Sequence, residues 1–430
     1  MRLFTTLLSF TLLLNLCAQT TIERVSWNLA KHKYNKIYRC FDATMKEKVP
    51  KQQLQSLWEQ IESSGGKLVS IVDVKKEAMD ESMRQTATLK FELVALKMVL
   101  SEDEKGKING LFISQMGYAP PKYGQDLRLG KKFINFMSDG FMLSGELMVP
   151  AECNNCPLVI LVHGSGPNDK DETIGANKVF YDVALGLAAN GIASYRYDKR
   201  FKLYPELINK QFDLYDETIN DAVAAYNVLA SDTSLHFGKY YILGHSLGAY
   251  AMPLIADSIT GLKGAILFSA NARRLEDLIE YQMHYLTAWD GEVTKEEQKI
   301  VDENIAKAEN IRKGNFTDTT SAEALLAYWP GLWWKGVADY NPVEQVQQNT
   351  KIPFLILQGE KDYQITMVDY NLWVEGVGNQ PNVQMKSYPG LTHLFTPTEA
   401  EHPGPNDYFL PNNVSQQVIW DIAAWIKKME

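Results

Sequence analysis

The stretch KYYILGHSLG, residues 239–248, decides how the fold is interpreted. Lys239–Leu243 is rich in tyrosine and aliphatic residues, which predicts a buried strand. The following Gly-His-Ser-Leu-Gly places Ser246 between two glycines, just before a helix predicted to begin near Ala249. This order is typical of a sharp turn that exposes a nucleophilic serine, because the glycines let neighbouring segments pack closely around it. The alternative is an ordinary strand-to-helix turn.

A serine hydroxyl becomes a nucleophile only when a base takes its proton and a third group orients that base. Asp362 lies in the loop after an apolar strand predicted at 353–358, and His393 follows the next predicted strand, 383–388. Taken alone, Asp362 is more simply interpreted as a turn former, and His393 as a structural histidine. Their order along the chain favours Ser246, Asp362 and His393 as a catalytic triad. The reserve residues for the acid and the base are Glu360, Asp369 and His402.

A second glycine-containing loop, His163–Asp169, follows an apolar strand predicted at 158–162. Acyl transfer uses backbone N–H groups to hold the oxyanion, one from the residue after the nucleophile and one from such a loop. We therefore predict an oxyanion hole made of the Leu247 N–H and one N–H from Ser165 or Gly166. The loop does not fit a dinucleotide site, because Asp169 stands where a third glycine is needed and would face the phosphates.

Strands and helices alternate over most of residues 125–430. Buried apolar strands that alternate with helices predict an α/β fold with a mostly parallel central sheet covered on both faces. A hairpin around Asp139-Gly140 is predicted before them. The other predicted core elements are strands at 158–162, 192–197, 239–243, 264–269, 353–358 and 383–388, and helices at 178–190, 216–230 and 415–427.

Residues 273–350 interrupt that alternation and predict a helical cap. Thr294 and Glu297 form a capping box that opens one of its helices. The aromatic residues of the insertion are most simply the core of the cap. An insertion at the carboxyl edge of the sheet also lies over the site, so some of these rings are expected to line an apolar or aromatic acyl pocket. The candidate pocket residues are His163, Trp329, Trp333 and Trp334.

Residues 22–115 show a different pattern, with helices followed by short β-like runs. Leu54, Leu57, Trp58 and Ile61 have helical spacing. This order predicts a small α+β domain, and it contains no cluster of catalytic residue types. Prolines and a glycine mark a linker at 116–124.

Met1–Ala18 carries one early positive charge and then an apolar run, Leu3–Leu14. The run is too short to span a membrane, which takes about 20 residues. It is typical of a secretory signal peptide, so we expect a secreted or periplasmic protein with no membrane span. The alternatives are a short anchor or buried helix, and a lipid anchor at Cys17, for which the preceding Leu16 is a poor fit.

The composition excludes several classes of protein. The chain has 430 residues, 45% of them hydrophobic, which is ordinary globular usage. Its net charge of −9 argues against a nucleic-acid-binding surface. The seven histidines are scattered and there is no Gly-Lys-Ser/Thr loop, so neither a metal nor another cofactor is expected. Cys153 and Cys156 lie in a turn, where an oxidised pair or two idle thiols are favoured over a redox or metal site.

Residues 125–430 resemble α/β-hydrolases of the serine esterase and peptidase type. The resemblance implies that Ser246, Asp362 and His393 form the triad. One of the shared blocks has no assigned role, and a structural ion-pair network near the site is favoured for it. The blocks that carry the resemblance are His163–Asp169, Arg196–Arg200, Gly244–Gly248, Gly359–Asp362 and Leu391–Phe395. Residues 35–115 resemble, by pattern alone, an NTF2-like domain of unknown function found before such hydrolases in secreted bacterial proteins.

These observations predict a serine hydrolase that cleaves a small-molecule ester through a covalent acyl-enzyme. A peptidase or an acyltransferase would use the same triad, and nothing in the sequence separates ester from amide cleavage. A non-catalytic binding protein on a hydrolase scaffold is the alternative from another class. The absence of paired metal-ligand spacing makes a metal-dependent hydrolase the weakest alternative. The natural substrate, the oligomeric state and the role of the first domain stay open.

Overall fold

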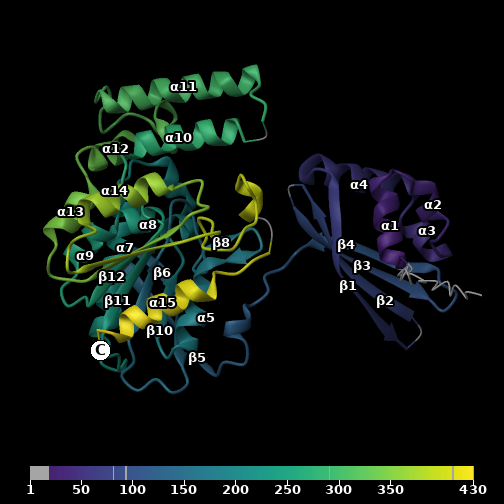
Figure 1. The fold of residues 1–430 in the computed structure, drawn as a ribbon, viewed down its shortest axis with the longest axis horizontal. Coiled ribbons are helices and arrows are strands. Elements are labelled where there is room, and N and C mark those ends of the chain that lie inside the picture. The colour runs from purple at the N-terminus through teal and green to yellow at the C-terminus, as the bar shows by residue number, and fades with distance from the viewer. Residues whose placement is uncertain (1–18, 81, 93, 290, 409–410, 430) are drawn as a thin grey trace, which may run out of the picture. The chain divides into compact units, whose positions relative to one another are not determined.

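The two compact units of the chain are Met1–Met116 and Gly117–Glu430. No helix in the part of the chain that the structure describes is long and apolar enough to cross a membrane. The expected signal peptide, Met1–Ala18, lies outside the described residues. The computed structural model describes residues 19–80, 82–92, 94–289, 291–408 and 411–429 (Figure 1).

The first unit packs helices against one face of a four-stranded antiparallel sheet in the order β1-β2-β3-β4. Leu54 and Trp58 of the predicted helix are buried in this core, whereas Leu57 is 45% exposed. The predicted α+β class is confirmed. The elements are α1 (Thr21–Ala30), α2 (Tyr34–Tyr38), α3 (Ala43–Lys48), α4 (Lys51–Gly65), β1 (Leu68–Met79), β2 (Ser82–Phe91), β3 (Ala95–Asp103) and β4 (Ile108–Gln115).

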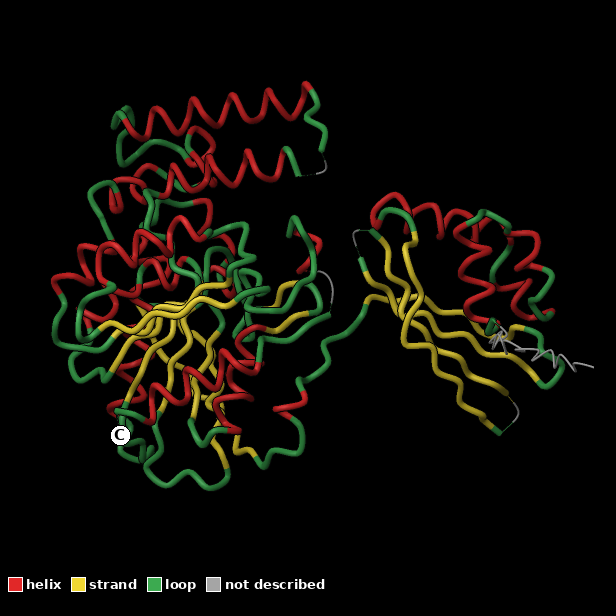
Figure 2. The backbone as a smooth tube through the Cα atoms, viewed as in Figure 1, coloured by secondary structure: helices red, strands yellow, loops and turns green. Residues whose placement is uncertain are grey.

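The second unit is built on an eight-stranded sheet in the order β14-β13-β12-β11-β7-β10-β6-β5. Its strands are the yellow segments at the centre of this unit in Figure 2. Six of these strands run parallel, and the hairpin β5–β6 joins the sheet antiparallel at one edge. The predicted mostly parallel α/β sheet is confirmed. The strands are β5 (Leu129–Ser138), β6 (Phe141–Pro150), β7 (Leu158–Val162), β10 (Ala193–Tyr197), β11 (Tyr240–His245), β12 (Gly264–Phe268), β13 (Phe354–Gly359) and β14 (Val383–Tyr388).

Both faces of the central strands are buried, which explains their unbroken apolar sequences. In β7, Val159 and Leu161 pack into one hydrophobic layer, while Ile160 and Val162 pack into the other. The first layer is covered by α5 (Val179–Ala189) and α15 (Gln416–Lys427). The second is covered by three helices on the opposite face (Figure 1). These are α7 (Asn220–Ser231), α9 (Met252–Ser258) and α14 (Met367–Val377).

One predicted helix differs from the observed one. The stretch predicted at 216–230 begins as a π-helical turn, η3 (Tyr215–Ile219), and continues as α7. Single π-helical turns within α-helices are rare and are found frequently at functional sites. Glu217 of this turn is directed into the interior, where it is 1% exposed.

In the insertion between β12 and β13, α10 and α11 lie side by side beyond the sheet with α12 next to them, whereas α13 packs against α14 and α9 (Figure 1). The predicted capping box is confirmed at the start of α11, where Thr294 accepts a hydrogen bond from the Glu297 N–H. The helices are α10 (Leu275–Thr287), α11 (Lys295–Arg312), α12 (Gly331–Val337) and α13 (Pro342–Gln348).

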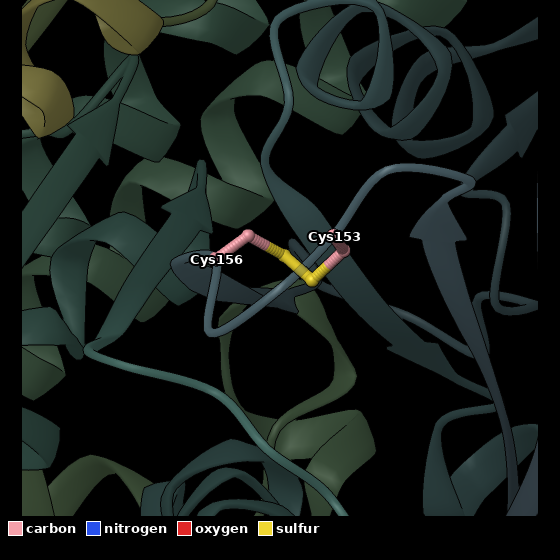
Figure 3. Close-up of a disulfide and its surroundings, with 2 residues drawn as sticks. All are labelled: Cys153 and Cys156. Atoms are coloured by element: carbon pink, nitrogen blue, oxygen red, sulfur yellow. A yellow bond between two sulfur atoms is a disulfide. The ribbon is translucent and has the colours of Figure 1, made fainter.

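Cys153 and Cys156 form a disulfide in the turn between β6 and β7 (Figure 3). The sequence favoured either an oxidised pair or two unpaired thiols at this turn, and the structure shows the oxidised pair. Cys40 carries a free thiol and is half-buried. The disulfide is remote in sequence from the serine, acid and histidine motifs and closes only a short local loop.

Candidate active site

Ser246 is the single residue between the end of β11 and the start of a short helix, α8 (Leu247–Tyr250). Its backbone has φ 55° and ψ −117°, a conformation that costs a non-glycine residue about 1–3 kcal/mol. Two backbone hydrogen bonds hold the turn: Ser246 N–H donates to Phe268 at 3.0 Å, and Tyr250 N–H donates to Ser246 at 2.9 Å. The side chain remains half-buried. The turn therefore presents a serine at the carboxyl end of a central strand.

The two flanking glycines are required by close backbone approach. A Cβ at Gly244 would lie 2.3 Å from the carbonyl oxygen of Gly248. A Cβ at Gly248 would lie 2.4 Å from the carbonyl oxygen of Val162 and 2.6 Å from that of His163. These distances are too short for any side chain, so the glycines let the turn pack against the end of β7.

Asp362 and His393 meet at the ends of the next strands, with Asp362 Oδ2 2.7 Å from His393 Nδ1. Both residues are 4% exposed. The second carboxylate oxygen, Oδ1, accepts the backbone N–H groups of Gln364 at 2.8 Å and Ile365 at 2.9 Å. Gln358 Nε2 donates to Oδ2 at 3.2 Å. The carboxylate is thus fixed in one orientation toward His393.

The serine turn and the histidine loop lie next to each other. His245, the residue before the serine, places its Nε2 2.9 Å from the carbonyl oxygen of His393. Across the described ranges, the Ser246 hydroxyl itself has no hydrogen-bond partner, so the structure does not join it to His393. Nucleophile-to-base hydrogen bonds are often long in free enzymes and tighten when substrate binds.

The reserve residues have other partners. Asp369 accepts hydrogen bonds from Arg273 and from backbone N–H groups. Glu360 accepts the hydroxyl of Ser387 at 2.7 Å. His402 contributes its backbone oxygen to Trp289. None of these contacts reaches His393, so the geometry favours Asp362 as its partner.

The hydrogen bonds of the loop after β7 show which of its backbone N–H groups are free to hold an oxyanion. The Gly164 N–H donates to Glu172 at 2.8 Å, and the Gly166 N–H lies 3.4 Å from Glu217 Oε1. Among the residues that the structure describes, the N–H groups of Ser165 and Leu247 have no acceptor. Of the two loop donors predicted from the sequence, Ser165 is therefore the free one.

The Arg196–Arg200 block forms a buried ion-pair network, as favoured from the sequence. Arg196 pairs with Glu146 at 2.6 Å and with Asp171. Arg200 pairs with Asp221 at 2.5 Å.

Lys199 has a role that the sequence did not reveal. Its Nζ donates to the Gly164 carbonyl at 2.7 Å and to Glu217 Oε1 at 2.9 Å. Lys199 and Glu217 are 2% and 1% exposed. The pair fixes the backbone of the loop that carries Ser165. Glu217 and Glu172 lie outside the motif blocks, and no local pattern marks them.

Lys199→Met is expected to lower the free energy of unfolding by about 3–5 kcal/mol, because it leaves the buried Glu217 carboxylate without its cation. Urea unfolding measures the loss. Adding Glu217→Gln to the same chain should restore part of it, since the unpaired charge is then gone. The matched control is Lys299→Met, where the exposed pair with Glu303 is worth well under about 1 kcal/mol. Equal losses of unfolding free energy in Lys199→Met and Lys299→Met would contradict the conclusion that the buried Lys199–Glu217 pair stabilises the fold.

The predicted pocket residues are mostly core residues. Trp333 and Trp334 are 0% and 1% exposed, and the Trp333 indole N–H donates to Glu217 Oε2 at 3.1 Å. His163 is also buried, between the rings of Phe180 and Tyr197, and burial lowers its pKa to about 4. These three side chains are therefore buried in the folded protein, and their place in an acyl pocket stays a prediction.

Trp329 is the exception, because it stays half-buried while it stacks on Trp333 with ring centroids 3.9 Å apart. Packing explains the burial of Trp333 and Trp334, because large rings at short spacing in a small cap fill its interior first. Glu217 links this cap core to the loop after β7, since its two oxygens meet Trp333 and Lys199.

Comparison with known proteins places this arrangement in a family. Residues 155–401 match the family described as serine aminopeptidase, S33. The chain is also 30% identical over 390 residues to esterase EstD of Thermotoga maritima, covering 89% of each chain. This chain belongs to the S33 family of α/β-hydrolases. It is a hydrolase enzyme, and its residues 23–111 match a second family, a protein of unknown function (DUF3887).

Solved structures resemble this hydrolase at low identity. Est1E from Butyrivibrio proteoclasticus has a TM-score of 0.45 at 17% identity, covering 69% of this chain and 98% of that one. The Pyrococcus furiosus esterase Pf2001 has a TM-score of 0.45 at 13% identity, covering 73% and 97%. A puromycin-hydrolyzing peptidase of Mycobacterium tuberculosis has a TM-score of 0.46 at 13% identity, covering 82% and 47%.

Proposed function

We propose that this hydrolase cleaves carboxylic esters of small molecules through a covalent acyl-enzyme on Ser246. The observation that carries the proposal is the 2.7 Å contact between Asp362 and His393, in a loop that touches the residue before the strained serine. The similarity to an enzyme named as an esterase supports the ester as substrate class.

In the proposed reaction, Ser246 Oγ attacks the ester carbonyl carbon while His393 Nε2 takes the hydroxyl proton. The tetrahedral oxyanion is held by the N–H groups of Leu247 and Ser165, each worth about 3 kcal/mol in the transition state. The carbon–oxygen bond to the alcohol then breaks, and His393 returns the proton to the leaving alkoxide. Water then attacks the carbonyl carbon of the acyl-enzyme while His393 takes its proton. The bond to Ser246 Oγ breaks, His393 returns the proton to the serine, and the carboxylic acid is released. Asp362 orients His393 and stabilises its charged form throughout.

The same apparatus would cleave an amide, and the matched family is described as an aminopeptidase. A peptidase, or an acyltransferase in which an alcohol replaces water, therefore remains the second candidate. A panel that pairs esters with amides of the same acyl group separates them, because only the leaving group differs between the two members of each pair.

We also propose that Met1–Ala18 exports the chain to an extracellular or periplasmic compartment. The Cys153–Cys156 disulfide supports this proposal, since such bonds persist in oxidising compartments. Determination of the amino-terminal residue of the protein from its native host tests it. A chain that still begins at Met1 would contradict export by cleavage.

The proposed function is tested by labelling the purified protein with a fluorophosphonate and locating the label by mass spectrometry. We expect the label on Ser246, and its loss in His393→Ala, because only an activated serine reacts. His236→Ala, at an exposed position, is the matched control and should label normally. A folded protein that takes no label would favour a binding protein on a hydrolase scaffold.

A further inference from the structure

A second histidine lies directly behind the proposed base. His245, the last residue of β11, is 2% exposed, and its Nδ1 lies 3.0 Å from Glu172 Oε2. Its Nε2 lies 2.9 Å from the backbone carbonyl oxygen of His393. The centroids of the two imidazole rings are 4.7 Å apart. His245, which directly precedes Ser246, therefore joins the serine turn to the loop that carries His393.

Glu172 extends this connection to the third part of the site. Its other oxygen, Oε1, accepts the Gly164 N–H at 2.8 Å, next to Ser165. Glu172 is 1% exposed and holds a left-handed backbone conformation, φ 49°, which is unfavourable for a residue with a side chain. One buried pair of side chains thus connects the loop after β7, the serine turn and the histidine loop.

The partners of His245 determine its protonation state. A backbone carbonyl oxygen and an ionised carboxylate can only accept hydrogen bonds. A neutral imidazole has one N–H, so its second nitrogen would direct a lone pair at one of these acceptors. Only the imidazolium form donates to both Glu172 and the His393 carbonyl.

The charges around the pair agree with this state. Burial lowers the pKa of His245, but the charge and hydrogen bond of Glu172 outweigh it and raise the pKa above its ordinary value. Burial raises the pKa of Glu172, but the charge and hydrogen bond of His245 outweigh it and lower the pKa below its ordinary value. The other charged groups that act on the pair are Asp362 and His163, and the backbone carbonyl and ring of His393 also contact His245.

The pH range of the pair follows from these directions. The stabilisation from His245 is complete below the pKa of an unfolded histidine and is lost as pH rises through the raised pKa. The stabilisation from Glu172 is complete above the pKa of an unfolded glutamate and is lost as pH falls through the lowered pKa. Both charges are therefore present together at pH values between the lowered pKa of Glu172 and the raised pKa of His245.

We propose that His245 is a positioning residue, held as an imidazolium by Glu172, that fixes the backbone of His393 against the Ser246 turn. This inference rests on the proposed function, because it takes His393 as the base. His245 touches no reacting atom and acts only through the position of His393. Misplacement of a catalytic group by about 1 Å lowers a rate about 100-fold, so a rigid anchor here has a catalytic effect.

The protonation state is tested by nitrogen NMR of the full chain with ¹⁵N-labelled histidine rings, at about pH 8, where an ordinary histidine is neutral. We expect His245 to show two ring N–H protons, assigned by their disappearance in His245→Gln. In Glu172→Gln we expect one, because the glutamine amide can donate to Nδ1 while Nε2–H still donates to His393.

Steady-state kinetics test the positioning role. We expect kcat to fall about 100-fold in His245→Gln with KM unchanged, since the substrate contacts remain while the base is misplaced. In Glu172→Gln we expect a fall of about tenfold, because the hydrogen bond to His393 persists without its charge. His236→Gln, at an exposed position, is the matched control.

Wild-type protein with a single His245 ring N–H would overturn the proposal, and so would a normal kcat in both folded variants. If a single variant unfolds, the double variant Glu172→Gln/His245→Gln replaces it, since two amides pair there without charge. That variant should fold, with kcat about 100-fold lower, and a normal kcat would again count against the proposal. The NMR result does not depend on turnover: a protein with both protons but no label on Ser246 keeps the charged state of His245 and loses the proposed function, and with it the positioning role.

Discussion

Ser246→Ala is expected to lower ester turnover by about 10⁶-fold, because loss of the nucleophile alone costs about as much as loss of a whole triad. Stability should change little. The side chain is half-buried, and its hydroxyl has no hydrogen-bond partner in the described ranges, so alanine removes no side-chain hydrogen bond of the folded protein. Hydrolysis of a chromogenic ester, together with urea unfolding, measures both quantities. The residual rate reports what the oxyanion hole and binding supply without the serine.

The chain offers a close control for this variant. Ser269 follows β12 as Ser246 follows β11, and its φ of 54° is almost the same. Its hydroxyl is buried and without a hydrogen-bond partner among the described residues. Ser269→Ala therefore makes the same change at a similarly strained position and should retain turnover. Substantial activity in Ser246→Ala, or an equal loss in Ser269→Ala, would contradict the assignment of the nucleophile.

Asp362→Asn is expected to lower kcat by about 10⁴-fold, because it forces the wrong tautomer on His393. The backbone N–H groups of Gln364 and Ile365 both donate to Asp362 Oδ1, so the asparagine oxygen must occupy that place. Its amide N–H then points at His393 Nδ1, which has to accept. The proton moves to Nε2, the nitrogen that should take the serine proton.

The measurement for Asp362→Asn is the ester hydrolysis rate against pH, with fluorophosphonate labelling of Ser246 as a second readout. Glu360→Gln is the matched control, since Glu360 is exposed and lies two residues away, and Ser387 is the one side-chain hydrogen-bond partner of its carboxylate among the described residues. We expect the control to keep its rate. If Asp362→Asn labels as fast as the unchanged protein, Asp362 is not the orienting acid.

The fold could be predicted, and the candidate serine, acid and histidine could be named, because their signals are local. Unbroken apolar runs mark strands that are buried on both faces, and Thr294 with Glu297 marks a helix start within four residues. The glycines around Ser246 follow from a backbone approach inside one turn. The order of serine, acid and histidine follows from the order of the strands that carry them. These features depend on residues close in sequence or on the chain order alone.

The buried polar contacts of the site could not be predicted in this way. Lys199 lies 35 residues from Gly164 and 18 from Glu217, and Glu172 lies 73 residues from His245. No spacing rule marks such pairs, because they are made when separate elements pack. The same packing left Ser165 rather than Gly166 with a free N–H, and buried Trp333 and Trp334 inside the cap.

The sequence by itself therefore determined the fold class, the cap and the candidate serine, acid and base, since hydrophobic periodicity and turn chemistry act over a few residues. The tertiary structure alone decided how those groups are held. A charge or an N–H in the interior must find a partner, and that partner is whichever group the packing of distant elements brings within about 3 Å.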